Sequence, residues 1–300
     1  MTTEESAAAA RPLVYAHRGA SGAFAEHTRA AYLQAIADGA DGVECDVHLT
    51  RDRHVVLLHD ATLDRTSDGT GQVADRTLEW LRTLDFSSWK GVRIPEAYGA
   101  KSEQFLTLPE LIDILRGAGR GIGLAIEFKH PSSFQLGLED RVLEVLREKG
   151  WNPRTSMLEN IIVSFMSFSP DSVKHLLESA PTGAVCQLVD DVNVAEIREE
   201  LRLGALTGGA LANVMKAARA EGERILAAGR AGIAGPGIGY VRAFPGTVQR
   251  WIGSGRRVRV WTVDAEDDVE RCRELGVHEI TTNWPAQVLA QLTADRQPLR

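Results

Sequence analysis

The stretch DGVECDVHLTRDRHVVLLHD, residues 41–60, decides the fold of this chain of 300 residues. Apolar and polar side chains alternate at its start, which is the period of a β-strand, and we expect a strand over 42–48. HVVLLHD, residues 54–60, is a second strand candidate, and only the short segment Thr50 to Arg53 separates the two. Because a parallel neighbour needs a crossover of about a dozen residues or more, we expect the two strands to pair as an antiparallel hairpin.

Strand-like segments alternate with helix-like segments along the rest of the chain. Besides 42–48, the expected strands are 13–16, 122–128, 160–165, 183–188, 232–236, 258–263 and 279–282. Helix starts are indicated by Thr28, the Thr107 to Glu110 capping box, Ser169-Pro170 and Asp264. Eight strands with helices between them predict a (β/α)₈ TIM barrel, and a doubly wound sheet is the alternative.

The stretch from about 60 to 106 is too long for an ordinary loop between a strand and a helix. It contains the amphipathic run TLEWLRTL, so we expect a small lid-like insertion after the hairpin. The barrel domain is expected to span 13–300. The first twelve residues, MTTEESAAAARP, hold acids and no long apolar run, which favours a disordered leader over a signal peptide.

Composition narrows the classes of protein to which the chain can belong. An apolar content of 44% is enough for a large core, and a net charge of -7 argues against a nucleic-acid partner. Cys45, Cys186 and Cys272 are expected to be free thiols, which favours a reducing compartment and a cytoplasmic location. The longest apolar runs are too short to span a bilayer, so no stable membrane anchoring is expected. A monomer and a homodimer both remain open.

Four short motifs place ionisable residues at or near the ends of predicted strands. They are His17-Arg18-Gly19, Glu44-Cys45-Asp46, His59-Asp60 and Glu127-Phe128-Lys129. Each motif alone is weak, since an isolated HRG is usually a solvated strand end and two nearby acids usually lie on a surface. Function in a TIM barrel sits where the strands end, so these motifs are expected to converge there. Two imidazoles, three carboxylates and two cations suit hydrolysis of a phosphate diester on a divalent ion.

The carboxylates predict a metal site. Alternate residues of a strand share a face, so Glu44 and Asp46 point the same way, and Glu127 and Lys129 do so on another strand. Neighbouring carboxylates repel, and a cation between them relieves the repulsion. Oxygen ligands favour one divalent cation such as Ca²⁺, Mg²⁺ or Mn²⁺ over zinc. Glu127 would complete the metal shell, while Lys129 would contact a phosphate oxygen.

The remaining groups suggest roles around a small phosphodiester. Arg18 offers a planar fork for two phosphate oxygens. One histidine must remove a proton from the attacking hydroxyl, and the other must donate one to the leaving oxygen. Sequence alone does not assign these roles to His17 and His59. The hairpin should carry His59 over the barrel mouth, which favours His59 as the acid.

Residues 16–71, AHRGASGAFAEHTRAAYLQAIADGADGVECDVHLTRDRHVVLLHDATLDRTSDGTG, closely resemble the opening of the glycerophosphodiester phosphodiesterases, especially the bacterial ones. IEFKHP (126–131), VSFMSFSP (163–170), VRVWTVD (258–264) and ELGVHEITTNWP (274–285) match later family blocks in order. The resemblance implies a TIM barrel with an inserted subdomain and hydrolysis to sn-glycerol 3-phosphate and an alcohol. It also implies His17 and His59 as the acid/base pair and Glu44, Asp46 and Glu127 as the metal ligands.

Several positions leave their roles open. Where the family often has PEN-T or PEH-T, this chain has Ala25-Glu26-His27-Thr28, and Glu26 and His27 could brace the first loop or act in the site. The family places a tryptophan at Trp261, which would wall the glycerol carbons of a substrate or simply pack in the barrel. If Trp261 points inward, Arg259 must do so too, low in the barrel and paired. Asn283 replaces a common family aspartate, which puts any charged role there in doubt.

Two other functions are considered. A lysophospholipase D would use the same chemistry but admit an acyl chain. A non-catalytic phosphate-binding protein would keep the cations but could lose a histidine, and the presence of both histidines and all three carboxylates argues against it.

Overall fold

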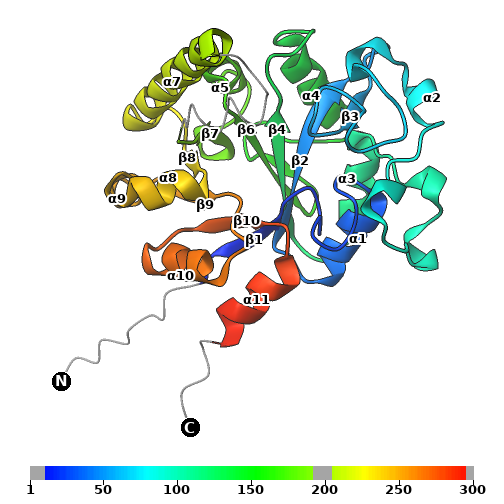
Figure 1. The fold of residues 1–300 in the computed structure, drawn as a ribbon. Helices are drawn as coiled ribbons and strands as arrows, with labels where there is room; N and C mark the ends of the chain where they lie inside the picture. The colour runs from blue at the N-terminus through cyan, green and yellow to red at the C-terminus, as the bar shows by residue number, and fades with distance from the viewer. Residues whose placement is uncertain (1–10, 192–204, 295–300) are drawn as a thin grey trace.

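Eight parallel strands close into a barrel in the computed structural model, which describes residues 11–191 and 205–294 (Figure 1). They are β1 (Leu13–Ala16), β2 (Gly42–Leu49), β4 (Ile122–Phe128), β6 (Ile161–Ser167), β7 (Val185–Val189), β8 (Ile233–Pro236), β9 (Arg257–Val260) and β10 (Glu279–Thr282). Each pairs with the next in this order, and β10 pairs with β1 to close the ring. The predicted TIM barrel is confirmed and the doubly wound sheet is excluded. All eight predicted strands are present, although β9 ends before Trp261.

Helices surround the barrel (Figure 1). They are α1 (Arg29–Ala37), α3 (Leu108–Arg116), α4 (Gly137–Glu148), α5 (Pro170–Leu176), α7 (Ala205–Ala227), α8 (Ile238–Ala243), α9 (Pro245–Gly253), α10 (Glu266–Glu274) and α11 (Pro285–Ala294), with a 3₁₀ turn, η5 (Thr182–Ala184). Thr28 and Ser169 cap α1 and α5, and the Thr107 to Glu110 capping box starts α3. The prediction that Asp264 starts α10 was wrong, since Ala265 is the N-cap residue of this helix. The carboxylate of Asp264 accepts a hydrogen bond from the backbone N–H of Asn283 instead.

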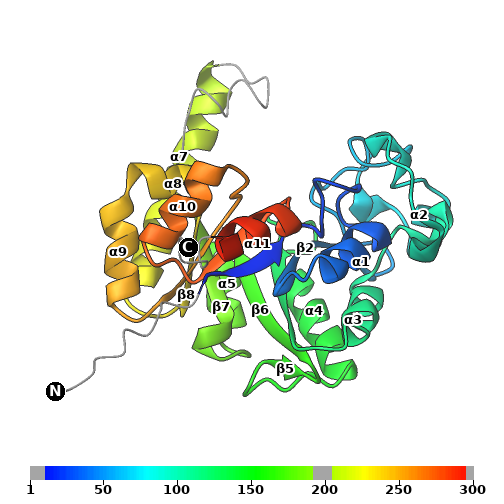
Figure 2. The same cartoon turned by 90° about the horizontal axis from the view of Figure 1, so that it is seen from below.

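The predicted hairpin is present. β3 (Val55–Leu57) runs antiparallel to β2, with Leu57 opposite Val47. A short strand that the sequence did not reveal, β5 (Met157–Leu158), pairs antiparallel with β6, and its two residues are too few to show a period. Figure 2 shows β5 at one end of the barrel and the first turns of α7 at the other.

The segment after the hairpin contains α2 (Leu78–Leu81) and four 3₁₀ turns. These turns are η1 (Val73–Asp75), η2 (Ser88–Lys90), η3 (Glu96–Tyr98) and η4 (Lys101–Glu103). A small apolar cluster joins the segment to the hairpin, and Phe86 stacks on Phe105 with ring centroids 4.2 Å apart. Of the expected leader, residues 1–10 lie outside the described residues, and Arg11 forms an ion pair with Asp41.

A buried ion pair fills the barrel interior near the start of β10. Arg259 points inward and is paired, as expected for the case in which Trp261 also points inward, and its Nε lies 2.6 Å from Glu279 Oε2. Both side chains are about 1% exposed, and the Arg259 guanidinium stacks over the ring of Tyr15 at 4.2 Å. Side chains therefore occupy the barrel core, which leaves its opposite end for chemistry.

Two further expectations concern the environment of the protein. Cys45, Cys186 and Cys272 are buried free thiols, as predicted. Within the described residues, no helix is both long and apolar enough to cross a bilayer.

Candidate active site

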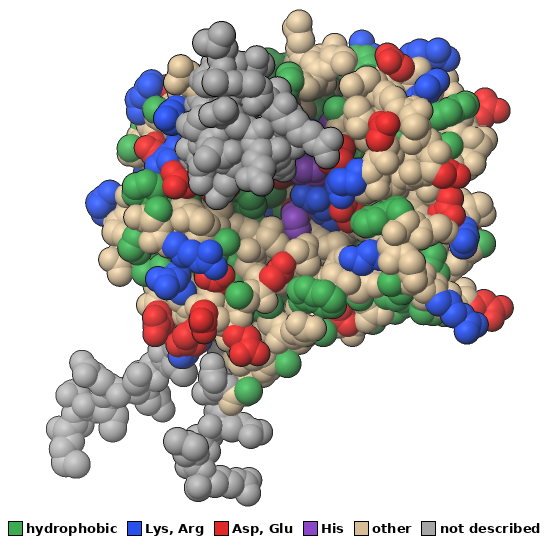
Figure 3. All heavy atoms as spheres, in the orientation of Figure 1, with side chains coloured by type: hydrophobic (Ala, Val, Ile, Leu, Met, Phe, Trp, Pro, Cys, Tyr) green, Lys and Arg blue, Asp and Glu red, His purple; other side chains and the backbone are tan. Residues whose placement is uncertain are grey.

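The four motifs converge at the carboxyl ends of the barrel strands. His17 follows β1, Glu44 and Asp46 lie on β2, and Glu127 lies on β4 directly beside Asp46 in the parallel register. Viewed from this end, the molecule has a central hollow in which histidine and basic side chains gather (Figure 3). The predicted convergence is therefore present.

The three carboxylates form a compact buried cluster. Glu44, Asp46 and Glu127 offer oxygen atoms that all lie within 4.8 Å of one another. Glu44 Oε2 accepts a hydrogen bond from the backbone N–H of Arg18 at 3.0 Å, while Glu44 Oε1 is buried without a hydrogen-bond partner among the described residues. Unpaired carboxylate oxygen in a buried cluster of hard ligands fits a divalent cation. These residues are thus suited to the metal that the sequence predicts.

Two basic side chains compensate only part of the charge of the cluster. Lys129 Nζ lies 2.5 Å from Glu127 Oε1 and 3.0 Å from Asp46 Oδ1, and Arg18 Nε lies 3.0 Å from Asp46 Oδ2. Although burial opposes it, the charges of Lys129 and Arg18 hold the pKa of Asp46 well below its usual range. Burial, together with the charges of Asp46 and Glu127, raises the pKa of Glu44 well above its usual range. Ionised Glu44 is therefore the carboxylate whose charge the protein side chains compensate least.

A left-handed turn brings Arg18 to this cluster. Arg18 has a φ of 59° and Gly19 a φ of 78°, a conformation that favours glycine. A Cβ atom at Gly19 would also lie 2.6 Å from the backbone of Ala31 in α1. The glycine of the HRG motif is therefore required by conformation and by the close approach of α1.

His17 is partly buried and held through one ring nitrogen. Its Nδ1 lies 2.8 Å from Asn283 Oδ1, and its backbone N–H donates to the carbonyl of Thr282. Burial first, and then the charge of Arg18, lower the pKa of His17 to about 3. The ring is therefore neutral near neutral pH.

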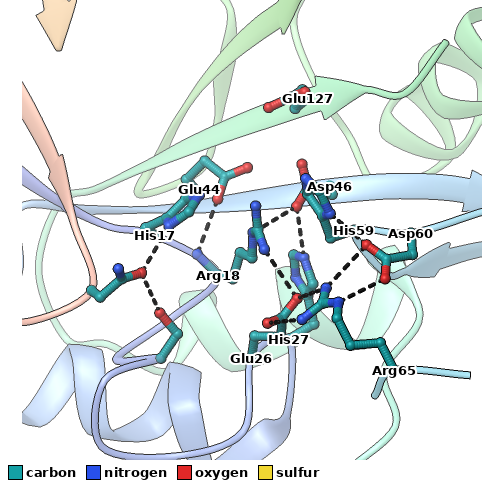
Figure 4. Close-up of polar contacts among 12 residues, drawn as sticks. His17, Arg18, Glu26, His27, Glu44, Asp46, His59, Asp60, Arg65 and Glu127 are labelled. Carbon is teal, nitrogen blue, oxygen red and sulfur yellow. Dashed lines mark hydrogen bonds and ion pairs between the residues drawn. The ribbon is translucent and has the colours of Figure 1, made fainter. Parts of the chain in front are cut away.

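His59 has a different environment. Its Nδ1 lies 2.6 Å from Asp60 Oδ1, and Asp60 Oδ2 accepts a hydrogen bond from Arg65 Nε at 2.7 Å. The hydrogen bond from His59 lowers the pKa of Asp60, and Arg65 adds to the effect. In Figure 4 the imidazoles of His17 and His59 lie to either side of Glu44 and Asp46. The hairpin thus brings His59 to the site from outside the barrel.

Glu26 and His27 brace the first loop. The His27 ring is buried, with Nε2 2.9 Å from Asp46 Oδ2 and Nδ1 2.9 Å from the hydroxyl of Tyr32. Glu26 accepts hydrogen bonds from Arg18 Nη1 at 3.1 Å and from both terminal nitrogens of Arg65 at 2.8 Å. The two residues hold Asp46 and the basic side chains in place.

Sequence reasoning missed Arg65, which pairs with Glu26 from 39 positions along the chain. It also missed His48 on β2, whose Nε2 lies 3.2 Å from the carbonyl oxygen of His59. The position of His48 on the same strand face as Glu44 and Asp46 was an available signal. No local signal marked Arg65.

Two aromatic residues lie at the mouth. The indole N–H of Trp261 donates to the carbonyl of Gly235 at 2.9 Å, and its ring meets Phe168 edge-on at 5.4 Å. The ring of Trp284 packs over Gly22, where a Cβ atom would lie 2.4 Å from the indole. A pocket of about 330 Å³ opens beside His17, lined by Arg18, Ser21, Gly22, Glu26, Trp89, Lys90, Asn283 and Trp284.

The family model described as "Glycerophosphoryl diester phosphodiesterase family" matches residues 17–287. The chain belongs to this family. The match covers every motif from the HRG turn to the start of α11 and confirms the resemblance seen in the sequence.

Relatives agree with the family assignment. The chain is 36% identical over 299 residues to "Probable glycerophosphodiester phosphodiesterase 1" of Mycobacterium tuberculosis, covering 99% of this chain and 98% of that protein. It is 29% identical to the "Glycerophosphodiester phosphodiesterase" of Bacillus subtilis, covering 92% and 84%. An Oleispira antarctica phosphodiesterase, solved in complex with the product sn-glycerol-3-phosphate, has the same fold, with a TM-score of 0.69, 24% identity and coverage of 94% and 97%.

Glu26 makes a pH-dependent contribution to stability. Burial opposes ionisation, but the Arg65 hydrogen bonds and the Arg18 charge outweigh it and lower the pKa of Glu26 from 4.5 to about 2. A lowered folded-state pKa stabilises the protein above the unfolded value, and this stabilisation is lost as the pH falls through the folded value. Glu26→Gln should therefore cost on the order of 2–3 kcal/mol near neutral pH.

Urea unfolding across a pH series measures the effect. The difference from the unsubstituted protein should shrink below about pH 4.5 and be nearly gone near pH 2. Glu159→Gln is the control, because Glu159 pairs with Arg116 but its side chain is 63% exposed. This substitution should lower the free energy of unfolding by less than about 0.5 kcal/mol. If Glu26→Gln lowers the free energy of unfolding by the same amount at every pH, the assigned ion pairs of Glu26 are contradicted.

Proposed function

We propose that the protein is a metal-dependent glycerophosphodiester phosphodiesterase. It would hydrolyse glycerophosphodiesters to sn-glycerol 3-phosphate and an alcohol such as choline, ethanolamine or glycerol. The observation that carries this proposal is the buried Glu44, Asp46 and Glu127 cluster with Arg18 and Lys129 against it. The names of the relatives, and the product bound to the Oleispira antarctica enzyme, support the substrate class.

Glu44, Asp46 and Glu127 would hold one divalent cation, Ca²⁺, Mg²⁺ or Mn²⁺. Such an ion, when bound, stabilises the negative charge that develops on a phosphate under attack. Arg18 and Lys129 would bind the non-reacting phosphate oxygens, Arg18 through its planar fork and Lys129 as a point charge. Trp261 would wall the glycerol carbons of the substrate.

The two histidines would share the proton transfers. His17, which burial keeps neutral, would accept the proton of the attacking hydroxyl, and His59 would donate a proton to the leaving alcohol oxygen. The attacking group is inferred to be the substrate's own glycerol hydroxyl next to the phosphate. Its oxygen bonds to phosphorus as the bond to the alcohol oxygen breaks, and water then opens the cyclic phosphate.

The inserted segment would limit the size of the substrate. Lys90 donates to the carbonyl of Ser21 at 2.9 Å, which ties the insertion to the first loop beside His17. Trp89 and Lys90 then line the pocket at His17, and acyl chains would meet this wall. Such a lid favours deacylated diesters as substrates and so argues against the lysophospholipase D alternative. Family membership favours an enzyme over a non-catalytic phosphate-binding protein.

The free cysteines support a cytoplasmic enzyme, since unpaired thiols are usual in a reducing compartment. The enzyme would act as a monomer or a homodimer on a small-molecule substrate.

Metal dependence has a direct test. Chelation should abolish activity, and Ca²⁺, Mg²⁺ or Mn²⁺ should restore it, measured by coupled assay of glycerol 3-phosphate release. Glu44→Gln removes a charge but keeps an oxygen that can accept from the Arg18 N–H, so the fold should survive while titrated metal binds much more weakly. Glu159→Gln serves as the matched control. Full activity in excess chelator would refute the metal site.

Substrate size distinguishes the two phosphodiesterase activities. Deacylated diesters should have a kcat/KM at least about tenfold above that of lysophospholipids, because the pocket wall excludes acyl chains. Trp89→Ala should narrow that ratio by opening the wall. Equal kcat/KM values for both substrates on the unsubstituted enzyme would favour the lysophospholipase D.

The roles of the histidines can be separated by the leaving group. His17→Ala and His59→Ala should each lower kcat by a factor of about 10² or more. A p-nitrophenyl diester needs little protonation of its leaving oxygen, so it should rescue His59→Ala only. The exposed His54 provides a matched control, His54→Ala. Rescue of His17→Ala instead would reverse the assignment.

A further inference from the structure

A chain of hydrogen bonds leads from His17 to a carboxylate that does not touch the ring. His17 Nδ1 lies 2.8 Å from Asn283 Oδ1, and Asn283 Nδ2 donates to Asp264 Oδ2 at 2.6 Å. Asp264 Oδ1 accepts from the backbone N–H of Asn283 at 2.9 Å and from the hydroxyl of Thr282 at 2.8 Å. The hydroxyl of Ser21 donates to Asn283 Oδ1 at 2.7 Å.

These contacts determine which way the Asn283 amide points. An ionised carboxylate only accepts hydrogen bonds, so the NH₂ end of the amide must face Asp264. The oxygen end then faces His17, where it can only accept. Nδ1 of His17 must therefore carry the proton, and in the neutral ring Nε2 is left with its lone pair.

We propose that Asp264 and Asn283 are positioning residues that fix His17 in the Nδ1–H tautomer, with Nε2 free to accept a proton. The catalytic consequence rests on the function proposed above, whereas the tautomer does not. A carboxylate at position 283 would also stabilise the charged imidazolium, but the amide supplies orientation without adding charge beside Arg18. Asp264 acts on His17 only through Asn283.

Asp264→Asn tests the relay. The amide introduced at position 264 would present an NH₂ group to Asn283 Nδ2, and two donors cannot pair, so the Asn283 amide should turn over. Its NH₂ end would then face His17 Nδ1, which should become an acceptor and leave the proton on Nε2. We expect a change from the Nδ1–H to the Nε2–H tautomer and a fall in kcat of at least about tenfold, with a smaller change in KM.

The tautomer is read by ¹⁵N NMR of protein labelled at histidine, without metal or substrate, since protonated and unprotonated ring nitrogens have distinct shifts. The chain has eight histidines, and the signal missing from His17→Ala identifies His17. Near neutral pH, the unsubstituted protein should show His17 protonated on Nδ1.

A double variant provides the decisive test of the relay. In Asp264→Asn/Asn283→Asp, the amide at position 264 donates to the new carboxylate at position 283, which accepts the proton of His17 Nδ1 as the original amide oxygen did. The Nδ1–H tautomer and most of kcat should return. Asn283→Asp alone would place two carboxylates against each other and should leave the site impaired. Asp113→Asn, on an ion pair between α3 and Lys149, is the matched control and should change neither the tautomer nor kcat.

The relay would be overturned by an Nε2–H tautomer in the unsubstituted protein or by an unchanged Nδ1–H tautomer in Asp264→Asn. If the double variant does not fold, Asn283→Ala should still lose the fixed tautomer, and its retention would overturn the relay as well. A different result would separate the two proposals. If the tautomers are as expected but the protein hydrolyses no glycerophosphodiester, the proposed function is rejected and the relay is not.

Discussion

Uncompensated negative charge among three buried carboxylates is the constraint on which the site depends. Glu44, Asp46 and Glu127 share one small volume with two cations, Arg18 and Lys129. Burying that charge is costly, so the surrounding residues are arranged to offset it. Arg18 is bent toward Asp46 by a left-handed turn, and buried His27 contacts the same carboxylate. A divalent cation would complete a compensation that the protein side chains leave unfinished.

The barrel makes this arrangement possible because its packed interior and its charged site lie at different ends of the strands. Arg259 and Glu279 neutralise each other where the interior is filled, with Tyr15 stacked on the guanidinium. Parallel register places Asp46 beside Glu127 near the other end, so two neighbouring strands supply adjacent carboxylates without any loop rearrangement. Rigid strands suit a cluster whose charges must stay within a few ångströms. The insertion then needs only to shape the approach to that cluster.

Local pattern was enough to predict the barrel, the hairpin and the charged cluster. Strand period placed Glu44 and Asp46 on one face, and the short Thr50 to Arg53 segment left an antiparallel pair as the only connection. Contacts between distant segments were beyond such reasoning. His17 meets Asn283 across 266 positions, and nothing near Asp264 marked it as a partner of Asn283 rather than a helix cap. The bracing role of His27 likewise depended on the position of Asp46, 19 residues further along the chain.

Under the proposed mechanism, the two histidines would take opposite tasks because their surroundings differ. The loss of solvent around His17 and the charge of Arg18 disfavour a second proton on its ring and outweigh the hydrogen bond to the Asn283 amide oxygen. His59 stands partly exposed at the end of a hairpin and its ring contacts the carboxylate of Asp60. Differences of this kind are how paired groups take separate acid and base roles. The asymmetry arises from the fold, because one ring follows a barrel strand and the other is carried in by the strand that pairs outside it.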